Sequence, residues 1–144
     1  MSPVLKVHFS EYGSFHVTSG NQACHYIGIP MIVLTLLTFL AQVALFEVAG
    51  WSVTLAEVVI LAVVAYYLTL DVPLGLLMLG VYAVLNLAAR PIPLAWAVGL
   101  FLLGWVFQFL GHYVYEKKAP AFYKNFTHLL VGPLWITAKA VGRA

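Results

Sequence analysis

The sequence has very few charged residues. They make up 8% of its 144 residues, against about 25% in an average soluble domain, while hydrophobic residues make up 63%. Most of a small domain is surface, so this composition excludes an ordinary water-soluble globule. Seven Lys and Arg against five Asp and Glu give a net charge of only +2, which excludes the basic surface of a nucleic-acid-binding protein. The composition is that of a small integral membrane protein.

Cysteine is almost absent, since Cys24 is the only one. A single cysteine excludes an internal disulfide and a thiolate metal cluster. The chain also lacks an HExxH sequence, so zinc protease chemistry has no support. Its carboxylates are too few for the acidic ligand set of a di-iron helical bundle. Any metal site must therefore rely on imidazole groups.

Long uncharged runs are abundant, and about 20 apolar residues suffice to cross a bilayer as a helix. We predict a single all-α membrane domain, residues 1–144, built as an integral membrane helical bundle of four spans. The expected spans are about 30–48, 51–70, 73–89 and 93–114, the first opened by Pro30. The C-terminal segment 125–143, broken at Gly132-Pro133, is expected to be an interfacial or a fifth helix.

Lysines are distributed unequally between the two ends of the predicted spans. Four spans place the N-terminal segment and the region after residue 114 on the same face of the membrane, with these lysines: Lys6, Lys117, Lys118 and Lys124. The opposite loops hold only Arg90. The positive-inside rule then makes the lysine face cytoplasmic. The chain is compact and carries no retention signal, so we expect a bacterial inner membrane. Nothing in the sequence predicts an oligomeric state.

Four of the five histidines are expected near one membrane face. An even number of spans brings His25, before the first span, and His112, near the end of the fourth, to similar depth. His16 precedes His25 on the same side, and His128 follows the fourth span. Ionisable groups in so apolar a chain cost free energy and usually have a partner or a task. We therefore expect a common site, with His128 as an additional ligand or as a snorkelling side chain.

Other polar residues recur at helical spacing beside these histidines. Gln108, His112 and Glu116 are four residues apart and predict one polar stripe on a helix. Asn21 and His25 form a second pair at the same spacing. We expect Glu116 to orient a ligand imidazole or to pair with a neighbouring lysine.

His16 lies nine residues before His25, so one straight helix would point their side chains in opposite directions. Ser19 and Gln22 have the spacing of a capping box. We therefore predict a break near Gly20 that turns His16 back towards His25.

Polar and small residues elsewhere in the spans have structural interpretations. Glu57 is expected to snorkel to the interface, and Asn86 to make an interhelical hydrogen bond. Gly99 and Gly104 are expected to permit close helix packing.

Sites rich in imidazole suit zinc, copper, nickel or iron, and the composition does not choose among them. Haem also remains possible, with His25 and His112 as axial ligands.

Two motifs resemble a known family. The N-terminal motif has His16, Asn21 and His25 in the spacing H-x4-N-x3-H, followed by Ile27-Gly28-Ile29-Pro30. The second runs from Trp105 to His112 as W-x2-QF-x-GH, followed by Glu116 and Pro120-Ala121. Gly132-Pro133-Leu134 resembles a closing element of the same family. Together they resemble the 2-hydroxy fatty acid dioxygenases, small multi-pass membrane proteins of phytosphingosine metabolism.

The resemblance implies a non-haem Fe(II) dioxygenase, independent of 2-oxoglutarate, that shortens a long-chain 2-hydroxy fatty acid by one carbon with molecular oxygen. The implied iron ligands are these histidines: His16, His25, His112 and His128. Asn21, Gln108 and Glu116 would position the ligands or the substrate. Lys117 and Lys118 would attract the substrate carboxylate, and the alkyl tail would lie in the bilayer. Two alternatives remain: a haem-binding electron-transfer protein and a non-enzymatic lipid-binding membrane protein.

Overall fold

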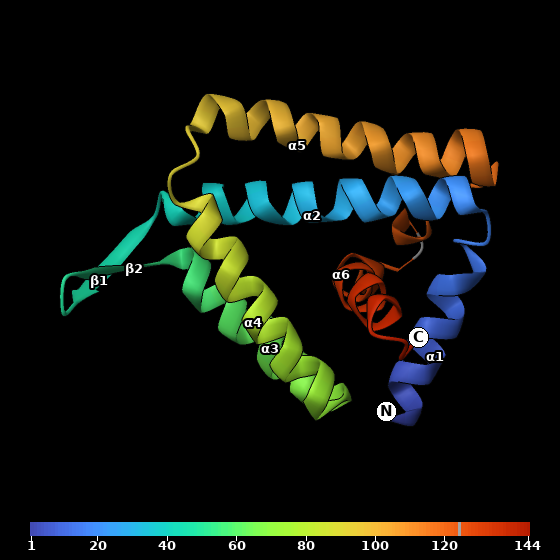
Figure 1. The fold of residues 1–144 in the computed structure, drawn as a ribbon, viewed down its shortest axis with the longest axis horizontal. Helices are drawn as coiled ribbons and strands as arrows, with labels where there is room; N and C mark the ends of the chain where they lie inside the picture. The colour runs from blue at the N-terminus through green and yellow to red at the C-terminus, as the bar shows by residue number, and fades with distance from the viewer. Residues whose placement is uncertain (124) are drawn as a thin grey trace. The chain divides into compact units, whose positions relative to one another are not determined.

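The computed structural model describes residues 1–123 and 125–144, which are mostly helical (Figure 1). Lys124, one of the lysines used to predict orientation, lies outside the described residues. The helices are α1 (Pro3–Ser14), α2 (Ser19–Ala41), α3 (Leu55–Leu70), α4 (Val72–Ala89), α5 (Leu94–Phe109) and α6 (Thr127–Ala140). The shorter elements are strands β1 (Ala44–Val48) and β2 (Trp51–Thr54), a π-helix η1 (Leu110–Glu116) and a 3-10 turn η2 (Ala121–Tyr123).

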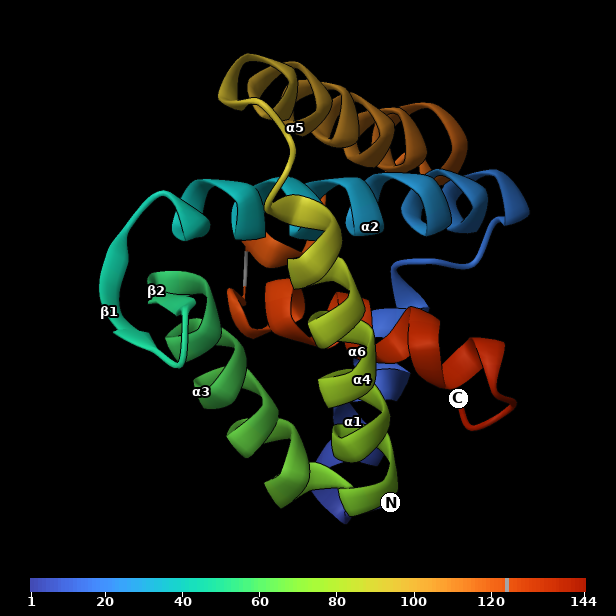
Figure 2. The same cartoon turned by 60° about the vertical axis from the view of Figure 1, so that its left-hand side comes forward.

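The chain divides into two compact units, residues 1–30 with 103–144, and residues 31–102. In the first unit, α6 packs against α1 and η2. In the second unit, α3 and α4 form an antiparallel pair, seen side by side in Figures 1 and 2, and the hairpin of β1 and β2 precedes α3.

Among the described residues, three helices are long and apolar enough to cross a membrane: Ser19–Ala41, Val72–Ala89 and Leu94–Glu116, the last being α5 continued by η1. This finding agrees with a membrane protein. The third predicted span, 73–89, coincides with α4 almost residue for residue. The second predicted span is the shorter apolar helix α3, with 16 residues. The count of four spans therefore stays a prediction.

The helix that contains most of the first predicted span begins before residue 30 and ends before residue 48. The helix begins at Ser19 and ends at Ala41, so Pro30 lies inside it rather than at its start. Pro30 therefore does not open the helix, because the first turns of α2 are polar and obtain partners from within the protein. A prediction based on hydropathy alone leaves such polar turns out of the apolar segment.

A β-hairpin occupies residues that the sequence analysis assigned to the ends of two spans. Strands β1 and β2 pair antiparallel, and Ala49 and Gly50 between them have φ of 48° and 79°. Two consecutive residues of positive φ are typical of tight hairpin turns. Thr54 then caps α3 by accepting from Ala56 N, so this helix begins at residue 55 and not at 51.

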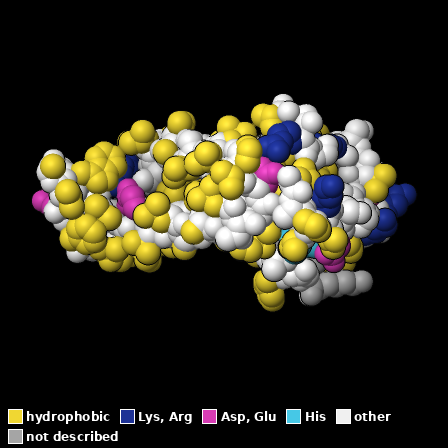
Figure 3. All heavy atoms as spheres, turned by 90° about the horizontal axis from the view of Figure 1, so that it is seen from below, with side chains coloured by type: hydrophobic (Ala, Val, Ile, Leu, Met, Phe, Trp, Pro, Cys, Tyr) yellow, Lys and Arg dark blue, Asp and Glu magenta, His cyan; other side chains and the backbone are white. Residues whose placement is uncertain are grey.

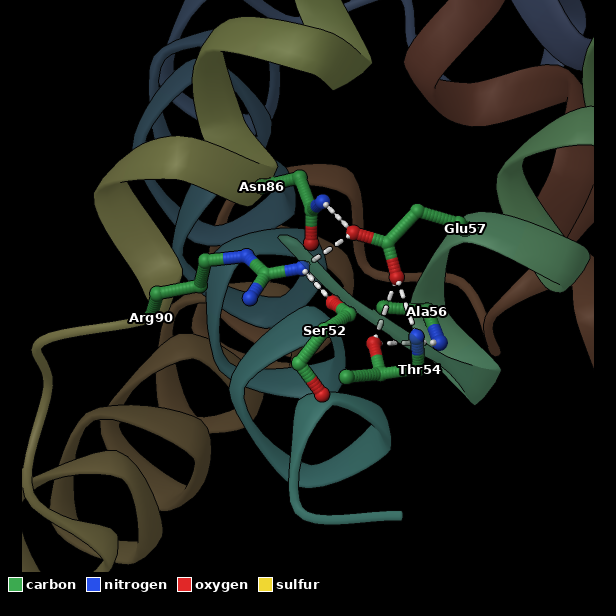
Figure 4. A network of polar contacts seen from close by, with 6 residues as sticks. All are labelled: Ser52, Thr54, Ala56, Glu57, Asn86 and Arg90. Carbon is green, nitrogen blue, oxygen red and sulfur yellow. Dashed lines mark hydrogen bonds and ion pairs between the residues drawn. The ribbon is translucent and has the colours of Figure 1, made fainter. Parts of the chain in front are cut away.

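Glu57 joins a polar network within the second unit (Figure 4). Its Oε2 accepts hydrogen bonds from the backbone N and Oγ1 of Thr54, at 2.8 and 2.6 Å. Its Oε1 accepts from Asn86 Nδ2 at 2.7 Å and from Arg90 Nη2 at 2.6 Å. The expected interhelical hydrogen bond of Asn86 is thus present, and a partner on α4 explains how Glu57 is accommodated in an apolar helix.

The C-terminal helix α6 continues through Pro133, so the expected break at Gly132-Pro133 is absent. With 14 residues it is about 21 Å long, shorter than a hydrocarbon core of about 30 Å. Its buried face includes Val131, Leu134 and Trp135. Packing against α1 therefore accounts for its apolar side chains.

The close approach of α2 and α5 in the first unit occurs at Gly28. A Cβ on Gly28 would lie 2.4 Å from Gln108 Nε2 and 2.8 Å from the carbonyl oxygen of Gly104. A Cβ on Gly99, by contrast, would meet nothing within 4 Å among the described residues, so the expectation that Gly99 permits close packing is wrong.

We expect Gly28→Ala to destabilise the protein by about 1–3 kcal/mol, because the added methyl group must displace an amide and a backbone oxygen. Gly99→Ala is the matched control on α5 and should leave stability unchanged or raise it slightly. Thermal unfolding of the detergent-solubilised variants measures both effects. Equal melting temperatures for the two variants would contradict the packing described.

Candidate metal centre

Three histidines from distant parts of the sequence come together in the first unit. The ring centroids of His16, His25 and His112 lie 4.3 to 4.9 Å apart. One ring nitrogen of each lies within 4.8 Å of those of the other two, and each residue is 2% exposed. The predicted convergence of His25 and His112 is confirmed, and His16 joins them.

Hydrogen bonds to the backbone fix the tautomers of two of these imidazoles. His16 Nδ1 donates to the carbonyl oxygen of Tyr12 at 2.6 Å, and His25 Nδ1 donates to that of Asn21 at 2.9 Å. A carbonyl oxygen only accepts, so in the neutral rings both Nε2 atoms carry lone pairs. These atoms are 3.0 Å apart. Two lone pairs held this close are stabilised by a positive group between them.

The donor set fits a transition-metal ion. Imidazole nitrogens bind such ions at about 2.0–2.1 Å. Two nitrogens that bind one ion with a right angle at the metal are therefore about 3 Å apart, as the Nε2 atoms of His16 and His25 are. His112 Nδ1 is buried without a hydrogen-bond partner among the described residues. Burial also lowers the pKa of His16 to about 3, so this imidazole is neutral at physiological pH, the form that binds metal.

His16 reaches this position because the chain turns between two helices. Helix α1 ends at Ser14 and α2 begins at Ser19, so the predicted break exists but lies at residues 15–18 and not at Gly20. Thr18, not Ser19, caps α2, since its Oγ1 accepts from Asn21 N at 3.3 Å. Gly20 lies within α2, where a Cβ would overlap the ring of Tyr115.

Glu116 holds this turn in place. Its carboxylate accepts hydrogen bonds from the backbone N of Val17 at 3.1 Å and of Thr18 at 3.0 Å. It also accepts from Thr18 Oγ1 at 2.9 Å and from Asn21 Nδ2 at 3.0 Å. Glu116 therefore fixes the turn that carries His16, and it does so from the helical segment that carries His112.

That segment is the π-helix η1, which follows α5 without interruption. Its wider turns differ from the α-helical spacing used to predict the stripe of Gln108, His112 and Glu116, yet all three side chains are buried. Lys117, with φ of 54°, ends the π-helix. Gly111 is also required here, because a Cβ would lie 2.6 Å from Asn21 Oδ1.

One buried amide atom of Asn21 and one of Gln108 lack hydrogen-bond partners among the described residues. Asn21 Oδ1 and Gln108 Nε2 are inaccessible to solvent and make no hydrogen bond among the described residues. Asn21 is one turn from His25, and Gln108 is one turn from His112. A buried polar atom without a partner is costly, so these atoms are available to a bound molecule.

Tyr12 was missed by the sequence analysis. Its ring stacks on that of His16, with centroids 4.0 Å apart and planes at 12°. Burial raises the pKa of its hydroxyl group, which therefore stays protonated. The i, i+4 spacing of Tyr12 and His16 was the available indication, but aromatic residues are so frequent in this chain that the spacing alone did not distinguish it.

The structure does not bring the remaining predicted residues into the cluster. His128 is buried against the edges of Tyr12 and Phe15, with its Nε2 3.5 Å from Glu11 Oε2. Lys117 and Lys118 are exposed.

We expect His128→Ala to keep its bound metal, because the structure groups only His16, His25 and His112 around one position among the described residues. Elemental analysis of the purified variant should give the same metal-to-protein ratio as the unaltered protein. Loss of metal from His128→Ala, with the fold intact by circular dichroism, would instead make His128 a ligand.

Comparisons with known proteins show which family the chain belongs to. A family profile described as "2-hydroxy-palmitic acid dioxygenase Mpo1-like" matches residues 3–144. The 2-hydroxy-palmitic acid dioxygenase MPO1 of Saccharomyces cerevisiae (strain ATCC 204508 / S288c) is 32% identical over 131 residues, which cover 88% of this chain and 73% of the relative. No solved structure matches the chain significantly. The resemblance found in the two motifs is confirmed over nearly the whole sequence, and the chain belongs to the Mpo1-like family.

Proposed function

We propose that the protein is an Fe(II)-dependent dioxygenase that converts long-chain 2-hydroxy fatty acids to fatty acids one carbon shorter, using molecular oxygen and no 2-oxoglutarate. The observation that carries the proposal is the cluster of three buried histidines, which are the histidines of the two family motifs. The relative's printed name, 2-hydroxy-palmitic acid dioxygenase, supports the substrate class.

His16, His25 and His112 would hold the metal, and bound Fe(II) would supply the redox chemistry with oxygen. Three neutral imidazoles leave other coordination positions open, as non-haem oxygenases need. The backbone carbonyls of Tyr12 and Asn21 keep two of the rings in the tautomer that points Nε2 inward. Glu116 acts through the turn at residues 15–18 and is a positioning residue.

The amides without partners would bind the head of the substrate. Gln108 Nε2 is a donor suited to the carboxylate, and Asn21 Oδ1 is an acceptor suited to the 2-hydroxyl group. Exposed Lys117 and Lys118 would attract the carboxylate at the level of the lipid headgroups. The alkyl tail would contribute about 0.8 kcal/mol for each buried CH₂ group.

The geometry favours this function over haem binding. Axial ligands of haem lie on opposite sides of the porphyrin plane, whereas these three imidazoles are in mutual contact around one position. A role in lipid binding alone gives no reason for two inward-pointing Nε2 atoms 3.0 Å apart.

We also propose that the N-terminal segment and the His112 end face the cytoplasm. Lys6, Lys117 and Lys118 belong to the unit that contains the histidine cluster, and the positive-inside rule favours the cytoplasm for lysines beside membrane spans.

Anaerobic loading with Fe(II), followed by exposure to oxygen and a long-chain 2-hydroxy fatty acid, tests the proposed function. We expect iron to bind and the fatty acid one carbon shorter to form without added 2-oxoglutarate. A protein that binds no iron, or that reacts only with added 2-oxoglutarate, would contradict the proposal. A Soret absorption band in the purified protein would favour the haem alternative.

A further inference from the structure

The hairpin of β1 and β2 has one apolar and one polar face. Residues paired directly across an antiparallel ribbon point to the same side, and the side alternates along the strand. The residues on one side, which we call the apolar face, are Phe46, Val48, Trp51 and Val53. The pair between them, Glu47 and Ser52, points to the other side.

The apolar face is largely uncovered by the protein. Phe46 is 59%, Val48 56% and Trp51 44% exposed. Hydrophobic side chains crowd the left end of Figure 3, where the hairpin lies. Neighbouring exposed side chains of this size indicate contact with another surface rather than with water.

Several contacts within the second unit place the hairpin beside the ends of apolar helices. Helix α2 ends at Ala41, just before β1, and Thr38 Oγ1 joins it to the end of α4 by donating to Ala89 O at 3.2 Å. Arg90, which follows α4, donates from Nη2 to Ser52 O at 2.8 Å, and its guanidinium group lies 4.0 Å from the ring centroid of Trp51.

Arg90, which contacts the hairpin, also forms an ion pair with Glu57 of α3 (Figure 4). A charged pair is costly at the centre of a bilayer but not at its boundary. Trp and Arg side chains also favour that boundary. The hairpin therefore lies where α2 and α4 would leave the hydrocarbon core.

A two-stranded ribbon cannot enter the core itself, because the outer edges of both strands expose backbone N–H and C=O groups that lipid tails do not satisfy. The headgroup region satisfies these groups and also receives apolar side chains. We propose that the hairpin is an interfacial anchor, with Phe46, Val48 and Trp51 inserted among lipid acyl chains and with Glu47 and Ser52 facing water.

Spin labels on adjacent residues of β1 test this proposal in the full-length protein, reconstituted in phosphatidylcholine vesicles. The buried Cys24 is first replaced by alanine, and single cysteines are then introduced as Phe46→Cys and, as matched control, Glu47→Cys. Oxygen concentrates in lipid, whereas Ni(II) ethylenediaminediacetate stays in water. We expect the ratio of oxygen to nickel collision rates to be several-fold higher at residue 46 than at residue 47.

Equal ratios at the two positions, or a lower ratio at residue 46, would show a hairpin that projects into water and would overturn the proposal. Dipolar broadening between labels at residue 46 would show a second copy of the chain on the apolar face, which also overturns it. If Phe46→Cys does not reconstitute, Val48→Cys compared with Ser52→Cys makes the same comparison.

Discussion

Replacing His25 with alanine is expected to abolish metal binding and, with it, oxidation of the proposed 2-hydroxy fatty acid substrate. His25 Nε2 lies 3.0 Å from His16 Nε2, so its removal takes away a donor that shares the central position. Substitutions of residues that only support a metal ligand lower metal affinity by about 10–100-fold. Removal of the ligand His25 should lower it further. Titration with Fe(II) under anaerobic conditions, with binding read by elemental analysis after gel filtration, measures the loss.

Cys24→Ala is the matched control for this substitution. Cys24 is the neighbouring residue on α2, is also buried, and is not one of the grouped ligands. The control should bind metal as the unaltered protein does. Full metal binding by His25→Ala, in a protein that remains helical, would show that the three histidines do not form the site.

Replacing Glu116 with alanine is expected to have the second largest effect, although Glu116 is not one of the grouped ligands. The substitution leaves the backbone N–H groups of Val17 and Thr18 without their acceptor. Both donors are partly buried and would lose their acceptor, so the turn that carries His16 should loosen. We expect metal affinity to fall by about 10–100-fold.

Two further variants separate this positioning role from a general loss of stability. Glu116→Gln keeps one acceptor oxygen and should recover part of the metal affinity lost in Glu116→Ala. Glu47→Ala removes an exposed carboxylate from the hairpin and should leave the affinity unchanged. Unchanged Fe(II) affinity in Glu116→Ala, measured by titration, would mean that the turn holds His16 without Glu116.

The histidine site could be predicted in outline because its residues follow local rules. Polar residues are rare in this chain, so few of them share a helix face at helical spacing. The histidines among them could meet if His25 and His112 lay at the same end of their helices. The break before His25 was also predictable, because one straight helix could not point both imidazoles inward. The family motifs pointed to the same residues.

Other features depend on contacts that spacing does not contain. Glu116 and Thr18 are 98 residues apart in sequence, and no local pattern pairs a carboxylate with a distant turn. Nor does spacing decide between a fourth ligand and a buried side chain for His128, whose position depends on how α6 packs against α1.

The hairpin was missed for a different reason. Its apolar residues satisfy the hydropathy of a membrane-spanning helix as well as that of an amphipathic ribbon. Only the positive φ angles at Ala49 and Gly50 and the cap at Thr54 separate the two structures. The positive φ angles cannot be deduced from the amino-acid composition of the segment.

X-ray absorption spectroscopy of the Fe(II)-loaded protein tests the central claim most directly, because scattering from imidazole rings reports the ligands themselves. We predict a first shell of nitrogen and oxygen with outer-shell scattering from the imidazoles of His16, His25 and His112, and a loss of part of that scattering in His112→Ala. An iron spectrum without imidazole scattering, or one unchanged by His112→Ala, would contradict the account.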